Sequence, residues 1–113
     1  MSPIRFEAHQ VALTAARLSL PLASTEGPSA IRALCGQLVR AVTSVPLNLA
    51  EGNGRLGRDR RYHFSVAYAS AKEATTALQL LAGTDFVDHR RVEAILAYLD
   101  RVQAMTWRLM KAG

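Results

Sequence analysis

The stretch 88-DHRRVEAILAYLDRVQAMTWRLMK-111 has the clearest helical pattern in this chain. Its apolar residues recur at alternating spacings of three and four, which places them on one face of a helix. The members of this stripe, with one threonine among them, are Val92, Ile95, Leu99, Val102, Thr106 and Leu109. Asp88 stands where a helix N-cap belongs. The pattern predicts a long amphipathic helix from about Asp88 to Lys111, and other helices must cover its stripe.

Three segments before this stretch also have a helical period, and clusters of Gly and Pro separate them. They run from about Ile4 to Leu20, from about Ser29 to Glu51, and from about Asp59 to Leu81, with Asp59 as the expected N-cap of the last. Pro46 lies inside the second segment and predicts a kink there. No segment alternates as a strand does. The sequence therefore predicts one all-α domain over residues 1–113, an antiparallel up-down four-helix bundle.

The last predicted helix has more apolar residues than one stripe needs. Leu96, Tyr98, Met105 and Trp107 lie off the main seam. Two interpretations are open: these residues widen the face that packs into the core, or they contact another subunit.

The composition favours a polyanion as partner. Lys and Arg number 14 against 9 Asp and Glu, a net charge of +5, and every cation except Lys72 and Lys111 is arginine. Such a surplus is typical of proteins that bind nucleic acid or an acidic protein. An Arg-rich solvated surface encoded by a GC-rich genome explains it equally well.

The cysteine, histidine and charge content indicates the cellular compartment and the kinds of site that we expect. Cys35 is the only cysteine, so it forms no intrachain disulfide, and this suits a cytoplasmic protein. No charge-free stretch has transmembrane length. The three histidines lie in different segments, and Cys35 has no evident histidine partner. We therefore expect no metal, no cofactor and no enzymatic activity.

The junction between the second and third predicted helices reads 52-GNGRLG-57, which satisfies the pattern G-x-G-x-x-G. This pattern marks a dinucleotide site only after a strand, and here a helix precedes it. A cluster of arginines follows: Arg55, Arg58, Arg60 and Arg61. With the free N–H groups of a helix start, these arginines predict a site for nucleic-acid phosphate. The competing interpretation pairs them with carboxylates such as Glu51 or Asp59, or with a neighbouring subunit.

Aromatic residues directly after this cluster have two possible uses. The run 62-YHF-64 stacks on bases or packs into the core, and packing is the more common use of such residues.

Polar residues form stripes on the second and third predicted helices. Arg40, Ser44 and Asn48 share a face, with Glu51 a short turn further on, and Ser70 and Glu73 share a face of the next helix. We hypothesise that the stripes meet in an internal network with a buried ion pair between Arg40 and Glu73, which would fix helix register. The alternative is that each polar group faces solvent. The full set is Arg40, Ser44, Asn48, Glu51, Ser70 and Glu73.

Two runs within these helices resemble a known family. The run 40-RAVTSVPLNLAEGNGR-55 is similar to the signature Arg, Ser-Ile-Pro-x-Asn-Ile-Ala-Glu-Gly, Gly-Arg of the four-helix-bundle proteins encoded in 23S rRNA intervening sequences. The run 67-AYASAKE-73 resembles the same family's Ala-x-Gly-Ser-x-x-Glu, with Ala69 in place of Gly. This family includes the accessory variability determinant proteins of diversity-generating retroelements.

The resemblance implies a bundle that assembles into a ring-like homopentamer with a basic surface and has no established enzymatic activity. In the retroelement members, the partner is a reverse transcriptase with its template RNA. The family's signature positions fall on Arg40, Asn48, Glu51, Gly52, Arg55, Ser70 and Glu73 of this chain.

The expected function is that of a non-enzymatic, cytoplasmic, oligomeric accessory protein that binds RNA or DNA, or a ribonucleoprotein such as a reverse transcriptase with its RNA. The alternative is a protein–protein scaffold that binds no nucleic acid. The expected phosphate contacts are Arg55, Arg58, Arg60, Arg61, Arg90 and Arg91.

Overall fold

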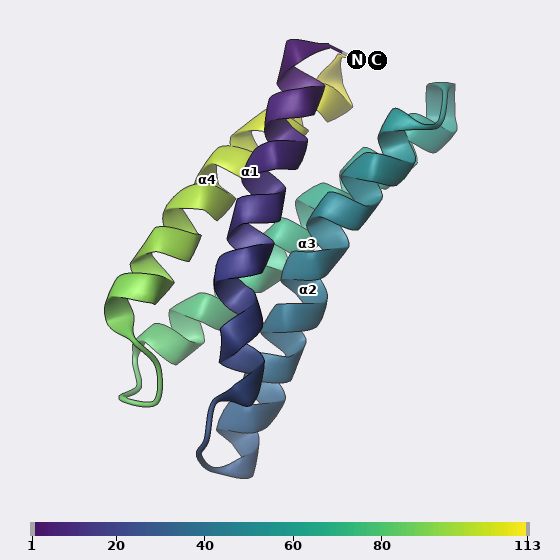
Figure 1. The fold of residues 1–113 in the computed structure, drawn as a ribbon. Coiled ribbons are helices and arrows are strands. Elements are labelled where there is room, and N and C mark those ends of the chain that lie inside the picture. The colour runs from purple at the N-terminus through teal and green to yellow at the C-terminus, as the bar shows by residue number, and fades with distance from the viewer. Residues whose placement is uncertain (1, 113) are drawn as a thin grey trace.

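The computed structural model describes residues 2–112, and within them every regular element is a helix. The elements are α1 (Pro3–Ser19), a 3₁₀ helix η1 (Leu20–Ser24), α2 (Ser29–Asn53), α3 (Gly57–Ala82) and α4 (His89–Lys111) (Figure 1). Each α-helix begins and ends within two residues of its predicted bounds. None of these helices is long and apolar enough to span a membrane.

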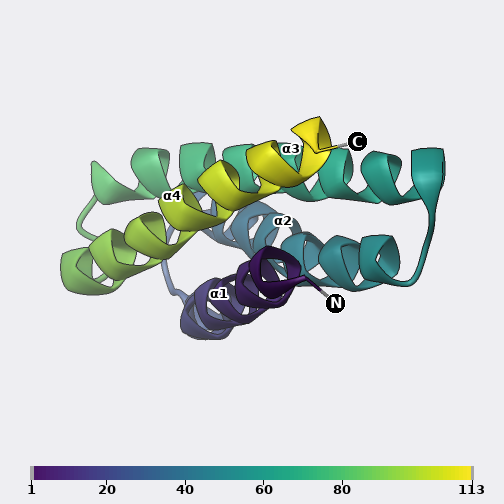
Figure 2. The same ribbon diagram turned by 90° about the horizontal axis from the view of Figure 1, so that it is seen from above.

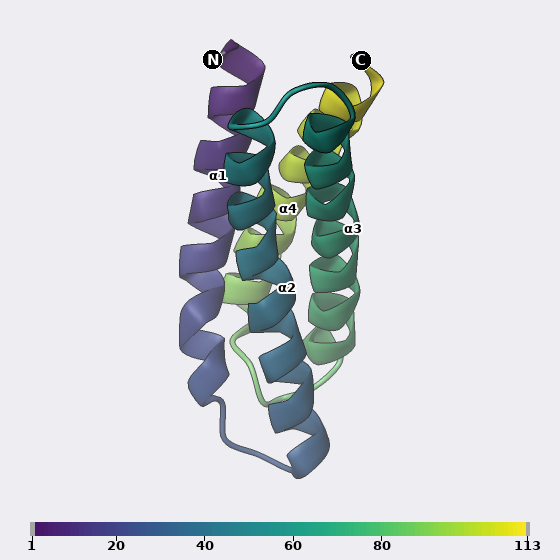
Figure 3. The ribbon, with the colours of Figure 1, turned by 90° about the vertical axis from the view of Figure 1, so that its right-hand side faces the viewer.

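The four α-helices run alternately up and down the long axis of a molecule that measures 44 × 22 × 18 Å (Figure 3). α1 packs against α2 and α4, and α3 packs against the same two helices, so α1 and α3 lie at opposite corners (Figure 2). The α2–α3 turn lies at the same end as the start of α1 and the end of α4. The other two connections lie at the opposite end (Figure 3). The predicted antiparallel arrangement of four packed helices is confirmed.

The predicted apolar stripe of α4 is the part of that helix that enters the core. Val92, Ile95, Leu99, Val102, Thr106 and Leu109 are all buried. Thr106 satisfies its hydroxyl by donating to the carbonyl of Val102 at 2.8 Å, so the polar group costs little inside the core. Small residues complete the core on the facing helices, where six alanines are fully buried and allow close approach: Ala8, Ala12, Ala15, Ala67, Ala71 and Ala74.

Of the additional apolar residues of α4, some widen the face that packs into the core and one stays exposed. Met105 is buried, and Leu96 and Tyr98 pack partly buried against the core, so these three widen the core face. Trp107 is 47% exposed, and its ring lies against that of Tyr68 with 5.5 Å between centroids. Only Trp107 of this group remains available for a contact outside the chain.

The two expected N-caps have different outcomes. Asp88 caps α4 as predicted, because its carboxylate accepts a hydrogen bond from the backbone N–H of Arg90 at 3.0 Å. Asp59 is not an N-cap: α3 begins two residues earlier, at Gly57, and Leu56 occupies the cap position. Gly57 has a φ of +56°, a left-handed conformation that glycine adopts without strain, and this lets the chain turn into α3 before it reaches Asp59.

Candidate nucleic-acid interface

Positive charge is concentrated at one end of the bundle. We call this the basic end: the end at which α1 and α3 begin and α2 and α4 finish. It carries seven of the fourteen cations, namely Arg5, Arg55, Arg58, Arg60, Arg61, Arg108 and Lys111. Its three carboxylates are Glu7, Glu51 and Asp59. Four of the five net positive charges of the chain therefore lie at this end.

The opposite end is electrically balanced. Its cations are Arg17, Arg32, Arg90 and Arg91, and its carboxylates are Glu26, Asp85, Asp88 and Glu93. A polyanion that approaches the bundle is therefore attracted to one end and not to the other.

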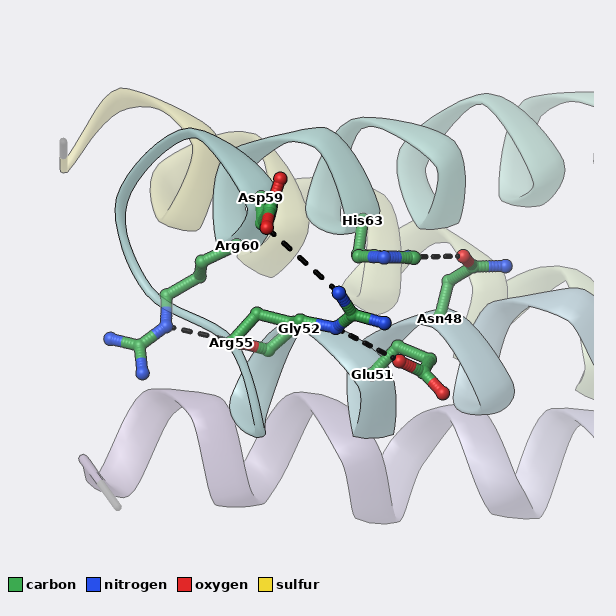
Figure 4. A network of polar contacts seen from close by, with 7 residues as sticks. All are labelled: Asn48, Glu51, Gly52, Arg55, Asp59, Arg60 and His63. Atoms are coloured by element: carbon green, nitrogen blue, oxygen red, sulfur yellow. Dashed lines mark hydrogen bonds and ion pairs between the residues drawn. The ribbon is translucent and has the colours of Figure 1, made fainter.

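The three carboxylates of the basic end form ion pairs with Arg55 and Arg101. Arg55 pairs with Glu51, Nε to Oε2 at 3.3 Å, and with Asp59, Nη1 to Oδ2 at 3.9 Å (Figure 4). Glu7 pairs with Arg101 at 3.2 Å. Carboxylate pairing, the competing interpretation from the sequence, is therefore the one that the structure shows for Arg55. Within residues 2–112, the other cations of the basic end have no ion-pair partner.

Arg60 has a structural role that the sequence did not indicate. Its Nε donates at 3.1 Å to the carbonyl of Gly52 at the end of α2, and this carbonyl also accepts the backbone N–H of Arg55 at 3.2 Å. The rest of its guanidinium points away from the turn (Figure 4). Arg58 and Arg61 are exposed in the first turns of α3. Three of the four clustered arginines therefore present unpaired N–H groups outward.

Arg90 and Arg91 do not belong to the same surface, and this corrects the expectation of one set of six arginines. They begin α4, which starts at the opposite end of the bundle (Figure 3). Arg91 donates from Nη1 to the carbonyl of Leu18 at 3.0 Å and thereby caps the end of α1. Sequence reasoning missed this bond because 73 positions separate its partners.

A polar network joins α2 to α3, and its centre matches the hypothesis from the sequence. Asn48 donates from Nδ2 to the carbonyl and the hydroxyl of Ser44, at 2.9 and 3.0 Å, and Ser70 donates to the Ser44 hydroxyl at 2.9 Å. The sequence did not predict a further member: His63 Nδ1 lies 3.0 Å from Asn48 Oδ1 (Figure 4). The hypothesis of an internal network is confirmed for Ser44, Asn48 and Ser70.

The expected buried ion pair between Arg40 and Glu73 is wrong, because both side chains are exposed. The guanidinium of Arg40 lies along its own helix, near Gly36. Ser and Asn keep their polar atoms close to the backbone, between the two helices. Long Arg and Glu side chains on the rim of the same face reach water instead, which avoids the cost of burying a charge.

The aromatic run at the start of α3 is used mainly for packing. Phe64 is 2% exposed and belongs to the core, and His63 is part of the polar network. Tyr62 is 63% exposed and meets the His63 ring edge-on. Only Tyr62 of the three is available to stack on a base.

The described residues offer no evident place for a metal ion. Within residues 2–112, no three His, Cys, Asp or Glu side chains come together as a group of ligands. Cys35, on α2, is buried.

The fold and the charge distribution define a small, all-helical bundle protein with one cationic end and a polar seam between its second and third helices. A family model confirms a more particular identity: the chain belongs to the family of 23S rRNA-intervening sequence proteins, whose model matches residues 6–108. This family was expected from the residues of α2 and α3.

A solved structure shows the same fold. It is the crystal structure of a protein of unknown function from the S23 ribosomal protein family of Bacteroides thetaiotaomicron. The TM-score is 0.75 at 19% identity, over 96% of this chain and 95% of that one. No curated protein matches the sequence. At this identity, the likeness supports the fold alone.

Proposed function

We propose that this protein is a non-enzymatic accessory protein that binds the phosphate backbone of nucleic acid through its basic end. The observation that carries the proposal is the placement of charge: four of five net positive charges lie at one end. There the carboxylates are occupied by Arg55 and Arg101, so other cations remain for phosphates.

The contacts come from arginines that the structure leaves without carboxylate partners. Arg58 and Arg61 are exposed, Arg60 offers its terminal nitrogens, and Arg5 and Arg108 lie on the adjoining helices. Guanidinium groups contact phosphate in a bidentate way, and contacts to phosphate carry no sequence information. Binding therefore has little sequence preference. On a single strand, log K falls with log salt by about 0.7 for each phosphate neutralised.

Assembly belongs to the same proposal. Large apolar side chains remain exposed on all four helices, among them Phe6, Leu47, Leu80 and Trp107, with exposed fractions between 47 and 66%. Exposed apolar surface supports self-association, and the family resemblance supports a ring-like homopentamer. A ring presents several basic ends to one strand, which raises the overall affinity through multivalency. In a retroelement setting, the partner is a reverse transcriptase with its RNA.

Binding to a short RNA and to a short DNA duplex, measured by fluorescence anisotropy at low and at physiological salt, tests this proposal. The R58A/R61A variant is the test, and R32A/R90A is its matched control. Each variant removes two positive charges from exposed arginines near a helix start, but the control removes them from the neutral end. We expect salt-sensitive binding that R58A/R61A weakens at least about tenfold more than the control does.

Two outcomes contradict the proposal. Equal losses in both variants would show that the position of the charge is irrelevant. No binding at low salt would leave a protein–protein scaffold as the better account. Trp107, which is 47% exposed and lies against Tyr68, favours that second function, and W107A would then dissociate the assembly in sedimentation velocity.

A further inference from the structure

The basic end contains a pocket that the proposed function does not require. It has a volume of about 380 Å³ and lies between the start of α1, the start of α3 and the last turn of α4. This volume is at the lower end of the range for small-molecule sites, about 300–1,000 Å³. The pocket therefore suits a ligand of limited size.

One side of the pocket is cationic. Arg5, Arg60 and Arg61 line it, and no carboxylate does so within the described residues. Arg5 Nε donates to Ser2 Oγ at 3.3 Å, and Arg60 Nε donates to the carbonyl of Gly52 at 3.1 Å. Both bonds hold the guanidinium through Nε and leave the terminal N–H groups for a ligand. With Arg61, three guanidinium groups surround one concave space, and they predict an anion that has several acceptor oxygens.

The other side of the pocket is apolar. Ile4, Phe64 and Leu109 form it. The Phe64 ring is held against Gly52, and the same glycine accepts the bond from Arg60. One residue thus positions both a cation and the apolar wall, and a preorganised site loses less free energy when a ligand is fixed in it.

Charge selects among the phosphates that fit. A phosphomonoester carries a charge of about −1.5 to −2 near neutral pH, because its second pKa is about 6. A phosphodiester within a strand carries a single negative charge and continues on both sides. A small pocket with three arginines therefore favours the terminal phosphate, and its apolar wall favours an attached nucleoside.

We propose that this pocket, between Arg5, Arg60 and Arg61, binds a nucleoside monophosphate unit through its phosphomonoester. The unit is either a free nucleotide or the 5′-phosphorylated end of an RNA strand. The second case rests on the proposed function, whereas the first is independent of it.

Two measurements on the full chain separate these cases. Calorimetry compares AMP, adenosine and inorganic phosphate. Anisotropy compares one RNA oligonucleotide with a 5′-phosphate and with a 5′-hydroxyl. We expect AMP to bind, adenosine not to bind, and the phosphorylated RNA to bind about tenfold tighter than its hydroxyl form, as charge-assisted hydrogen bonds to one phosphate allow.

The R5A variant tests the pocket, and R58A is its control, because Arg58 lies at the basic end but does not line the pocket. R5A abolishes AMP binding and brings the two oligonucleotides to equal affinity. R58A weakens both oligonucleotides to the same degree and leaves AMP binding unchanged. Circular dichroism of both variants checks that the helical fold is kept.

The outcomes are distinguishable from those of the proposed function. RNA binding with no preference for the 5′-phosphate and no AMP binding would overturn this inference and leave the proposed function intact. AMP binding without RNA binding would overturn the proposed function and leave this inference intact. Inorganic phosphate that competes as well as AMP would overturn the role of the apolar wall.

Discussion

Gly52 is the position at which the structure has no room for a Cβ atom. A Cβ built on it lies 2.5 Å from Cε1 and 2.7 Å from Cδ1 of Phe64, and 3.3 Å from the carbonyl oxygen of Arg60. Carbon atoms pack at about 3.5–4.0 Å, so G52A requires the ring to move by about 1 Å. Phe64 is 2% exposed, so a shift of its ring disturbs both its core neighbours and the apolar wall of the adjoining pocket.

The expected size of the effect follows from two opposing terms. Overpacking of a core costs about 1–3 kcal/mol, and the better helix propensity of alanine returns about 0.5–1 kcal/mol. We expect G52A to lower the free energy of unfolding by about 1–2 kcal/mol. For a domain of this size, that corresponds to about 4–8 °C in Tm.

Two other glycines provide matched controls in urea unfolding followed by circular dichroism at one fixed protein concentration. At Gly54 the nearest atom to an added Cβ is 3.6 Å away, so G54A is expected to change stability by less than about 0.5 kcal/mol. At Gly36 the only close atom is the mobile Arg40 Nη1 at 3.4 Å, so G36A is expected to stabilise the protein by about 0.5–1 kcal/mol.

The clash with Phe64 is tested directly by the double variant G52A/F64L. A smaller ring-free side chain relieves the contact, so the two substitutions together are expected to cost less than the sum of their separate costs. The reasoning is refuted if G52A unfolds at the same urea concentration as G54A, or if the two effects simply add.

Three further predictions concern side chains with specific partners. N48A leaves the interhelical polar network incomplete and is expected to lower the free energy of unfolding by about 1–2 kcal/mol. The control R40A, at an exposed position on the same helix, is expected to change it by less than about 0.5 kcal/mol. Equal effects of the two variants in chemical denaturation would contradict this prediction. R91A removes the cap of α1 and is expected to lower the free energy of unfolding by about 1 kcal/mol. The control in the same chemical denaturation is R90A, because the exposed side chain of Arg90 has no partner in the described residues. An R91A variant as stable as R90A would show that the bond to the Leu18 carbonyl does not contribute to stability. R58A is expected to reduce the slope of log K for RNA against log salt by about 0.7, and an unchanged slope would exclude a phosphate contact by this residue.

Local patterns were sufficient to predict the four helices and the buried face of α4. The stripe from Val92 to Leu109 predicted the core face of α4, because burial follows a period of 3.6 residues in any helical bundle. The i, i+4 spacing of Ser44 and Asn48 likewise predicted their shared face, on which the structure shows a hydrogen bond between them.

Contacts between distant positions were beyond sequence reasoning. His63 reaches Asn48 from another helix, and Arg91 reaches the Leu18 carbonyl across 73 positions. Neither pairing leaves a periodic mark in the sequence. The apolar residues beside the α4 stripe were ambiguous for the same reason, because only the position of α3 decides that Trp107 meets Tyr68 at the surface.

The helix count, the buried stripe of α4 and the excess of arginine could be predicted from the sequence, since each is a property of composition or of short spacing, and the family could be predicted from its motifs. The tertiary structure alone decided that Arg5 and Arg61 line one pocket although they are distant in the chain, that Arg91 lies at the other end, and that Arg55 is neutralised by its neighbours. The physical reason is that an antiparallel bundle brings alternate helix ends together, so the location of a charge depends on the direction in which its helix runs and not on its place in the sequence.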